Sequence, residues 1–255
     1  KPGNTEARFD AKENDLRRSR GTMNALTCVC GTAGSGKTLV ILGLLQLARK
    51  RGMPIGASKP VDVGDIEYQS KDLASDAERF LEIGRMPEHI SLINPYLLNE
   101  TLPIQLAAER DGIRLDLKLI EKRLDELSKR YPQVLIEGPS GLLTPITDSS
   151  SWLEIIKMWH PQLIWVSGIG VSDLETSLLA LRILQESGLS VKIILNSFSA
   201  NQNREMIQYQ WLTLEEQLKA SVLGFVPYFK NELLDQMSLA LESMMEEPWP
   251  NPEES

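Results

Sequence analysis

Residues 30–38 read Cys30-Gly31-Thr32-Ala33-Gly34-Ser35-Gly36-Lys37-Thr38. From the first glycine to the threonine they match the pattern G-x-x-x-x-G-K-[ST], which is typical of phosphate-binding loops. Glycines let such a loop wrap closely around phosphate oxygens with its backbone N–H groups turned inward. Lys37 would place a positive charge against the β- and γ-phosphates, and the Thr38 hydroxyl would be a ligand of Mg²⁺.

The residues on either side of this loop provide the setting that the pattern requires. Residues 25–29 form an apolar run of strand length, and residues 38–48 form a mostly apolar run of helix length. A helix that begins directly after the loop adds its own N-terminus as an anion site. The alternative, a chance lysine in a glycine-rich turn, is the weaker one in this context. We therefore predict that a nucleotide is bound by the following residues: Gly31, Thr32, Ala33, Gly34, Ser35, Gly36, Lys37 and Thr38.

Composition excludes several classes of protein. The formal net charge is −8, and no run of Lys and Arg suits the backbone of a nucleic acid, so no nucleic-acid partner is expected. No apolar run reaches the length of a membrane span and no signal peptide is visible, so we expect a cytoplasmic protein without a membrane partner. Cys28 and Cys30 lie two positions apart on a predicted strand without metal-site spacing, which favours buried structural thiols.

Strand and helix patterns alternate along the rest of the chain. Apolar runs predict further strands at 55–58, 133–137, 161–166, 190–195 and 222–226. Helical spacing predicts helices at 69–84, 105–110, 116–127, 174–186 and 204–220, and residues 90–102 are expected to be irregular. This alternation, without a repeat or a linker, predicts an α/β fold: a doubly wound, mostly parallel sheet flanked by helices, as in P-loop NTPases.

The ends of the chain differ in composition from its middle. Residues 1–22 are polar and carry both charge signs, so we expect a disordered or non-native leader. Residues 23–245 are predicted to form a single P-loop α/β domain. Residues 246–255 are acidic and proline-bearing, which indicates a mobile tail.

Two charged residues stand at the carboxyl ends of predicted strands, where α/β sheets bind their ligands. Glu137 ends an apolar strand and runs into a glycine-rich turn, and an acid in this place holds Mg²⁺ in P-loop enzymes. Lys59 follows the strand at 55–58, although a solvated lysine is the simpler interpretation of that position alone. The two histidines, His89 and His160, stand beside no motif, so no histidine base is expected.

Taken together, these motifs resemble the dethiobiotin synthetase family. The resemblance runs from about residue 23 to about residue 228 and depends on the order and spacing of many short pieces. The matching pieces are Gly36-Lys37-Thr38, Lys59-Pro60-Val61, Ser75-Asp76-Ala77, Asn94-Pro95-Tyr96, Leu106-Ala107-Ala108-Glu109, Glu137-Gly138, Leu195-Asn196 and Gly224-Phe225-Val226-Pro227.

The resemblance implies a specific reaction. The family carboxylates the vicinal diamine 7,8-diaminononanoate with CO2, phosphorylates the carbamate with MgATP, and closes the ureido ring with release of phosphate. By analogy, Lys37 and Lys59 would be the catalytic residues that hold the carbamate and the transferring phosphoryl group. Asn196 would contact the adenine, with Pro227 also at the nucleotide. Mg²⁺ would be held by Thr38, Asp76 and Glu137, and the protein would be a homodimer because the family's pocket spans two subunits.

The departures from the family fall on the substrate pocket. The family's loop is typically one residue longer and carries an Asp-Thr-Glu stretch that helps to bind the substrate, and Ala33-Gly34-Ser35 replaces that stretch here. Asp62 and Val63 replace a small residue and a serine, and Glu175-Thr176 replaces an Asn-His pair whose asparagine comes from the partner subunit. We expect ATP and Mg²⁺ chemistry to be retained and the pocket to be altered. The residues assigned to the substrate on this basis are Asp62, Gly138, Ser140, Gly141 and Glu175.

Three alternatives stay open at this point. One is a related ATP-dependent ligase or synthetase with a different substrate. A second is a nucleotide-binding switch ATPase. The switch ATPases with the most similar fold usually carry a second lysine within the phosphate-binding loop, whereas this loop has Thr32, Ala33 and Gly34. The third is a catalytically silent binding protein.

Overall fold

The computed structural model describes residues 26–64, 75–218, 220–230 and 234–244. The predicted leader at 1–22, the predicted tail at 246–255 and positions 69–74 of a predicted helix lie outside the described residues. The boundaries of the single domain at 23–245 therefore stay a prediction.

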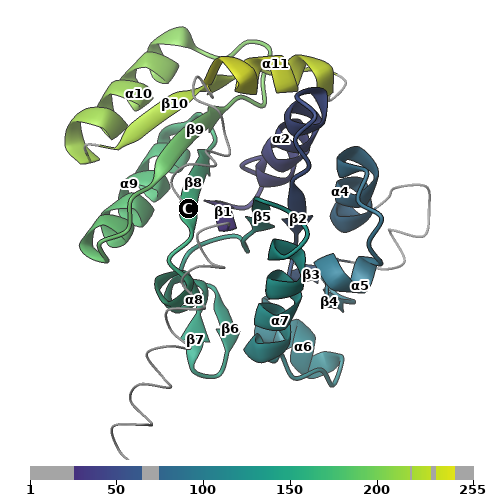
Figure 1. Cartoon of the computed structure of the whole chain (residues 1–255). Coiled ribbons are helices and arrows are strands. Elements are labelled where there is room, and N and C mark those ends of the chain that lie inside the picture. Colours follow the sequence, from purple (N-terminus) through teal and green to yellow (C-terminus); the bar gives the residue numbers. More distant parts are fainter. Residues whose placement is uncertain (1–25, 65–74, 219, 231–233, 245–255) are drawn as a thin grey trace, which may run out of the picture.

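The centre of the molecule is a parallel sheet of six strands in the order β10-β9-β8-β1-β5-β2 (Figure 1). The predicted doubly wound, mostly parallel sheet is confirmed. The six strands are β1 (Leu26–Gly31), β2 (Gly56–Ser58), β5 (Val134–Glu137), β8 (Gln162–Ser167), β9 (Lys192–Asn196) and β10 (Ser221–Val226).

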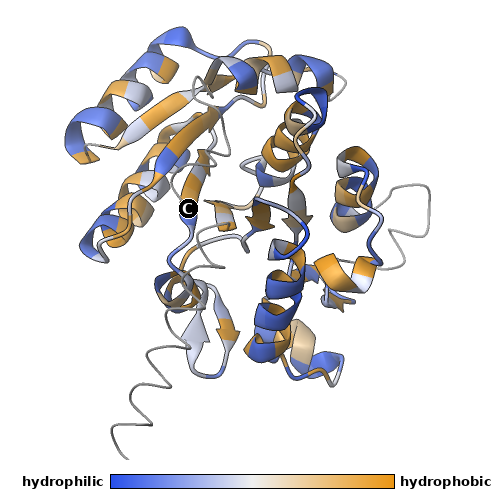
Figure 2. Cartoon of the chain, in the orientation of Figure 1, coloured by the Kyte–Doolittle hydropathy of each residue, from blue (hydrophilic) through white to orange (hydrophobic). Residues whose placement is uncertain are grey.

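Helices cover both faces of this sheet. On one face α2 (Lys37–Lys50) packs against α4 (Asp76–Gly84) and α11 (Leu234–Met244). On the other face lie α7 (Leu117–Ser128), α9 (Val171–Glu186) and α10 (Arg204–Leu218), as right-handed crossovers between parallel strands require. Figure 2 shows apolar residues along the strands and hydrophilic ones on the outer sides of the helices. No helix in the described ranges is long and apolar enough to span a bilayer.

Several short elements differ from the sequence predictions. The stretch 90–102, predicted to be irregular, contains α5 (Ile90–Ile93) and the strand β4 (Tyr96–Leu98), so that prediction is wrong. β4 pairs in parallel with β3 (Val61–Val63), and this pairing joins segments that are distant in the chain. The structure also contains elements that were not predicted. They are the hairpin of β6 (Pro145–Thr147) and β7 (Ser150–Ser151), α8 (Trp152–Trp159) and α11, whereas the predicted short helix is present as α6 (Ile104–Arg110).

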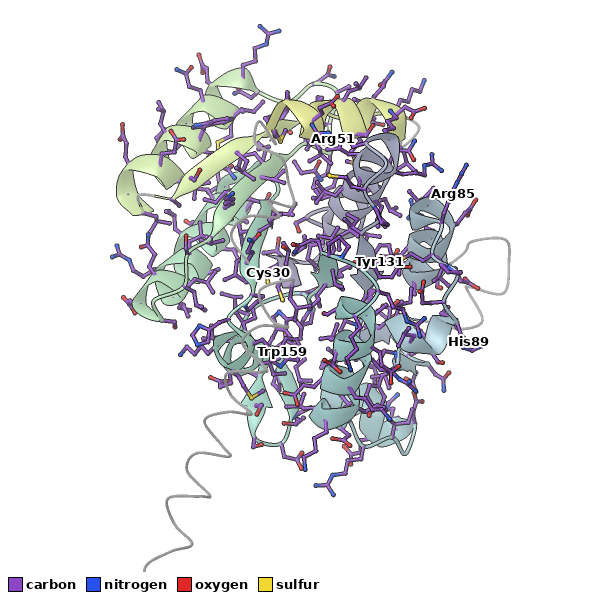
Figure 3. All side chains as sticks on the ribbon, viewed as in Figure 1. Cys30, Arg51, Arg85, His89, Tyr131 and Trp159 are labelled. Atoms are coloured by element: carbon purple, nitrogen blue, oxygen red, sulfur yellow. The ribbon has the colours of Figure 1, made fainter. Side chains whose placement is uncertain are left out.

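The core runs through the middle of the sheet. All six residues of β1 are buried, because the strand lies between β5 and β8 with helices on both faces. Cys28 and Cys30 are free thiols inside this strand, which confirms the structural interpretation. Figure 3 shows Cys30 in the interior of the molecule. The phosphate-binding loop therefore starts from one of the most enclosed segments of the fold.

Candidate active site

The loop between β1 and α2 has the conformation that its glycines predict. Gly36 has a φ of +90°, in the left-handed region that favours glycine. A Cβ at this position would lie 2.1 Å from Nδ2 of Asn196, so a residue with a side chain does not fit unless Asn196 moves. The Asn196 amide in turn donates a hydrogen bond of 2.9 Å to the carbonyl oxygen of Ser35. The end of β9 thus holds the loop in place.

The side chain of Lys37 lies across this loop. Its Nζ donates to the carbonyl oxygens of Thr32 (2.8 Å) and Gly31 (3.2 Å), and only 7% of the residue is exposed. Burial lowers the pKa of Lys37, and the carboxylate of Glu137 acts in the opposite direction. The structure therefore places a buried cation at the start of α2, where the sequence predicts it.

The three predicted metal ligands converge from three separate elements. The Thr38 hydroxyl, in the first turn of α2, lies 3.2 Å from Oδ2 of Asp76 at the start of α4. The same hydroxyl lies 3.0 Å and 3.1 Å from the two carboxylate oxygens of Glu137 at the end of β5. Ser75 caps α4 and forms a capping box with Glu78, which fixes the position of the neighbouring aspartate.

This donor set fits Mg²⁺ in the form in which nucleotides carry it. Within the described residues, no three His, Cys, Asp or Glu side chains form a group that could hold a metal ion by themselves. Two carboxylates and one hydroxyl are instead a partial set of hard oxygen ligands. Mg²⁺ is bound in this way when phosphate oxygens and water complete its coordination.

Lys59 lies at the centre of an acidic cluster. Its Nζ is 2.5 Å from Oδ2 of Asp76, 3.0 Å from Oδ1 of Asp62 and 3.3 Å from Oε1 of Glu137. Burial acts to lower the pKa of Lys59, but the three carboxylates together raise it above its ordinary value. The interpretation of Lys59 as a solvated strand-end lysine is therefore wrong, because its ammonium group is enclosed and paired.

The acids around Lys59 are themselves shifted by their surroundings. Burial raises the pKa of Glu137, of which only 5% is exposed, and the charges of Lys59 and Lys37 partly oppose the shift. Burial likewise raises the pKa of Asp62, again with Lys59 opposing it. Residues in a cleft whose pKa values are shifted by burial and by a specific charge partner are candidates for a functional site.

Asn94 has a role that the sequence analysis did not assign. Its side-chain amide donates to the carbonyl oxygen of Lys59 at 2.7 Å and lies 3.3 Å from that of Tyr96. The backbone N–H of Lys59 donates to the carbonyl oxygen of Ile93 at 2.9 Å. The Asn94-Pro95-Tyr96 motif therefore holds the backbone of the central lysine. The sequence offered only the match of this motif to the family, and that match did not indicate what Asn94 does.

The two lysines and the three predicted metal ligands line one cavity of about 750 Å³. Three of the predicted substrate residues, Asp62, Gly138 and Ser140, line it, and Arg79 of α4 is a lining residue that was not predicted. Gly141 and Glu175 are not among the described residues that line it. Glu175 is exposed on α9. The predicted site residues that line the cavity are Gly34, Gly36, Lys37, Thr38, Lys59, Asp62, Asp76, Glu137, Gly138 and Ser140.

A second, smaller cavity of about 270 Å³ adjoins the first, since Leu39 and Phe198 line both. The predicted nucleotide residues Asn196 and Pro227 border it. Its remaining walls are mostly aromatic or apolar, including Tyr228 and Phe229. A small, mostly apolar cavity beside a phosphate-binding loop suits a nucleotide base.

The histidines lie away from both cavities. Figure 3 shows His89 at the periphery beside α5, and its ring contacts Ser91 of the same turn. His160 is exposed at the end of α8. Neither is among the described residues that line the two cavities.

Comparison with known proteins places this geometry in a family. The family model described as "AAA domain" matches residues 27–237. The chain belongs to this AAA domain family. It is similar to the ATP-dependent dethiobiotin synthetase BioD of Thermodesulfovibrio yellowstonii, with 26% identity over 215 residues, 81% of this chain and 90% of the relative. It is also similar to the protein of the same name from Nitrosospira multiformis, with 28% identity over 218 residues, 84% of this chain and 93% of the relative.

These relatives confirm the resemblance inferred from the motifs, and the level of identity makes this chain a divergent relative. Among solved structures, the chain is similar to the MinC:MinD cell division protein complex of Aquifex aeolicus. The match has a TM-score of 0.51 and 17% identity, and it covers 87% of this chain and 94% of that chain. At this identity the likeness concerns the fold alone.

Proposed function

We propose that this protein is an ATP- and Mg²⁺-dependent ligase that converts 7,8-diaminononanoate and CO2 to dethiobiotin. The observation that carries the proposal is the cluster of Lys37, Thr38, Lys59, Asp76 and Glu137 in one cavity next to a chamber for a base. The relatives described above are named for this activity, and the chain spans nine-tenths of their length. A related ligase with another substrate, or a switch ATPase, is not better supported.

The nucleotide would lie across the two cavities. Backbone N–H groups of residues 31–38 and the N-terminus of α2 would bind its phosphates. Because the amide nitrogen of Asn196 is committed to Ser35, its carbonyl oxygen is the atom available to the amino group of adenine. Pro227 and the aromatic walls would enclose the base.

Mg²⁺ would be held by Thr38, Asp76 and Glu137 together with phosphate oxygens. When bound, it supplies charge stabilisation for the oxygens of the transferring phosphoryl group. Its positive charge would also stabilise the buried carboxylate of Glu137, whose pKa is raised by burial.

The two lysines would act on the reacting groups. Phosphoryl transfer needs positioning and charge stabilisation more than acid–base catalysis. Lys37 would bind the phosphates. Lys59 would bind the anionic carbamate, which would exchange with one of the three carboxylates that now contact this lysine.

A second copy of the chain would complete the substrate pocket. Glu175 is exposed on α9 and does not line the cavity, so it reaches a substrate only across a subunit interface. Val171 and Leu179 on the same helix are 69% and 68% exposed. Exposed apolar side chains on a helix that carries a predicted substrate residue favour a homodimer.

The test is an end-point assay with 7,8-diaminononanoate, bicarbonate and MgATP, in which mass spectrometry detects dethiobiotin. Product that depends on Lys37 supports the proposal. Binding of MgATP without any product would contradict it and would favour a ligase with a different substrate on the same scaffold.

A further inference from the structure

Asp62 differs from the other two acids around Lys59. Asp76 and Glu137 both contact the Thr38 hydroxyl and so belong to the metal set. In the described part of the chain, Asp62 makes no hydrogen bond to that hydroxyl. Its Oδ1 lies 3.0 Å from Nζ of Lys59 and accepts the backbone N–H of Val63 at 2.9 Å. Asp62 thus lines the cavity without being one of the predicted metal ligands.

The position of Asp62 is enclosed and rigid. The residue lies in the middle of β3, which pairs with β4, and only 8% of it is exposed. A buried carboxylate is stabilised by a cationic partner and repels an anion. The phosphate-binding loop contains no acidic residue. Among the described residues that line the cavity, Asp62 is therefore the one acid outside the predicted metal ligands.

The pair of Lys59 and Asp62 presents opposite charges at neighbouring points of one wall. A vicinal diamine acquires the complementary pattern when one of its amines forms a carbamate. In that step the neutral amine nitrogen forms a bond to the carbon of CO2, a C–O π bond becomes the lone pair of the carbamate oxygen, and the nitrogen releases one proton to water. The product carries a negatively charged carbamate group on one nitrogen. While its second amine is protonated, it carries a positive charge on the neighbouring nitrogen.

We propose that Asp62 binds the free amine of the substrate in its ammonium form while Lys59 binds the adjacent carbamate, so that the site selects vicinal diamines. This inference rests on the proposed function. Binding exchanges the ion pair between Lys59 and Asp62 for two ion pairs to the substrate, so that each of these two residues keeps a partner of opposite charge. An amino alcohol offers a neutral hydroxyl in place of the cation and leaves Asp62 without a charged partner.

The experiment uses the full chain and two probes, 7,8-diaminononanoate and its analogue with one amine replaced by a hydroxyl. Calorimetric titrations are made in bicarbonate buffer with MgADP present, and dethiobiotin formation is assayed in parallel with MgATP. The variant Asp62→Asn keeps the shape of the side chain and an acceptor for the Val63 N–H. Asp148→Asn, an exposed acid outside this cavity, is the matched control.

We expect Asp62→Asn to weaken diamine binding by about 10- to 100-fold, the range for loss of a charged hydrogen bond. Binding of the amino alcohol and of MgADP should stay within about twofold of wild type, so that the preference for the diamine disappears. Asp148→Asn should match the wild type for every ligand. If Asp62→Asn does not fold by circular dichroism, Asp62→Ser provides the same comparison.

The outcomes separate this inference from the proposed function. Dethiobiotin formation with equal diamine affinity in wild type and variant overturns the role of Asp62 and leaves the function standing. Diamine binding that depends on Asp62 without dethiobiotin formation supports the inference and overturns the function. A wild-type protein that binds no diamine overturns both.

Discussion

The side-chain amide of Asn196 donates to the carbonyl oxygen of Ser35 at 2.9 Å, across 161 positions of sequence. This bond ties the carboxyl end of β9 to the phosphate-binding loop that follows β1. Gly36, the next residue of the loop, passes the same amide so closely that it has no room for a Cβ. The conformation of the loop is therefore set by a side chain from another strand as well as by its own glycines.

Two alanine substitutions separate backbone strain from this contact. Gly34 and Gly36 both have positive φ, so alanine at either position should cost about 1–2 kcal/mol of stability. A Cβ at Gly34 meets no described atom within 4 Å, whereas one at Gly36 meets the Asn196 amide. We expect Gly36→Ala to destabilise by about 1–3 kcal/mol more than Gly34→Ala in urea unfolding. Adding Asn196→Ala should recover part of the difference, and equal losses for the two glycines would contradict the contact.

Lys37→Ala should abolish nucleotide turnover. The side chain is a buried cation at the start of α2, and its loss removes charge stabilisation from the phosphates, with an expected decrease in kcat of about 10²–10³-fold or more. ATP hydrolysis coupled to product formation is the measurement. Lys118→Ala, at an exposed position of α7, is the control and should keep wild-type turnover. Undiminished turnover in Lys37→Ala would remove the loop from the mechanism.

Glu137→Gln should weaken the response to Mg²⁺. The carboxylate lies within 3.1 Å of the Thr38 hydroxyl, and an amide supplies only one neutral oxygen to a divalent cation. The Mg²⁺ concentration for half-maximal turnover should rise by about 10-fold or more. Glu186→Gln, an exposed acid at the end of α9, should leave it unchanged. An unchanged Mg²⁺ response in Glu137→Gln would place the metal elsewhere.

The buried thiols should lower stability at alkaline pH. Burial raises the pKa of Cys30 to about 11 and that of Cys28 well above its usual value. The pKa of each thiol in the folded state exceeds the unfolded value of about 8.5. The contribution of the thiols to the free energy of unfolding is therefore fully present below about pH 8.5 and is lost as pH rises toward 11. Urea unfolding at pH 7 and pH 10 measures the loss. A variant with both cysteines replaced by alanine should show a smaller decrease between these pH values.

The same thiols report on access to the core. At pH 8 iodoacetamide should leave both cysteines of the folded protein unmodified and should alkylate both in urea. Rapid modification of the folded protein would contradict the enclosed position of β1.

Glu175→Asn tests both the altered pocket and the second subunit. Removal of a negative charge near a substrate carboxylate should lower the KM for 7,8-diaminononanoate severalfold, without a change in the KM for ATP. Sedimentation at the assay concentration should show a dimer, since Glu175 does not line the cavity of its own chain. Glu186→Gln on the same helix is again the control. No change or a loss of affinity would show that Glu175 recognises another group.

The central part of the fold was predictable because its signals are local. β1, the loop and α2 are contiguous, and the long apolar runs gave β5, β8 and β9 to within a few residues. β3 and β4 are three residues each and exist only because they pair with one another across the fold. α8 was missed although Ser151 and Glu154 form a capping box before an apolar run, which is a readable signal.

The site was predictable in its residue types but not in its contacts. The loop pattern pointed to Lys37 and Thr38, and the end of an apolar strand pointed to Glu137. All three line the same cavity, because position on a strand or helix decides where each side chain lies. The pairing of Lys59 with Asp62 depends on how the chain runs from β2 in the central sheet to β3 in the small sheet with β4, which no short stretch of sequence encodes. The support of Lys59 by Asn94 likewise depends on the approach of two distant segments.

The first strand of the described chain lies in the interior of the sheet, between β5 and β8. During synthesis β1 emerges before both of its neighbours, which end at Glu137 and Ser167, more than a hundred residues further along the chain. Until then an apolar strand has no partner on either edge, and non-local pairing of this kind folds slowly. The arrangement that encloses the loop after β1 therefore leaves this strand unpaired in the nascent chain until β5 and β8 have been synthesised.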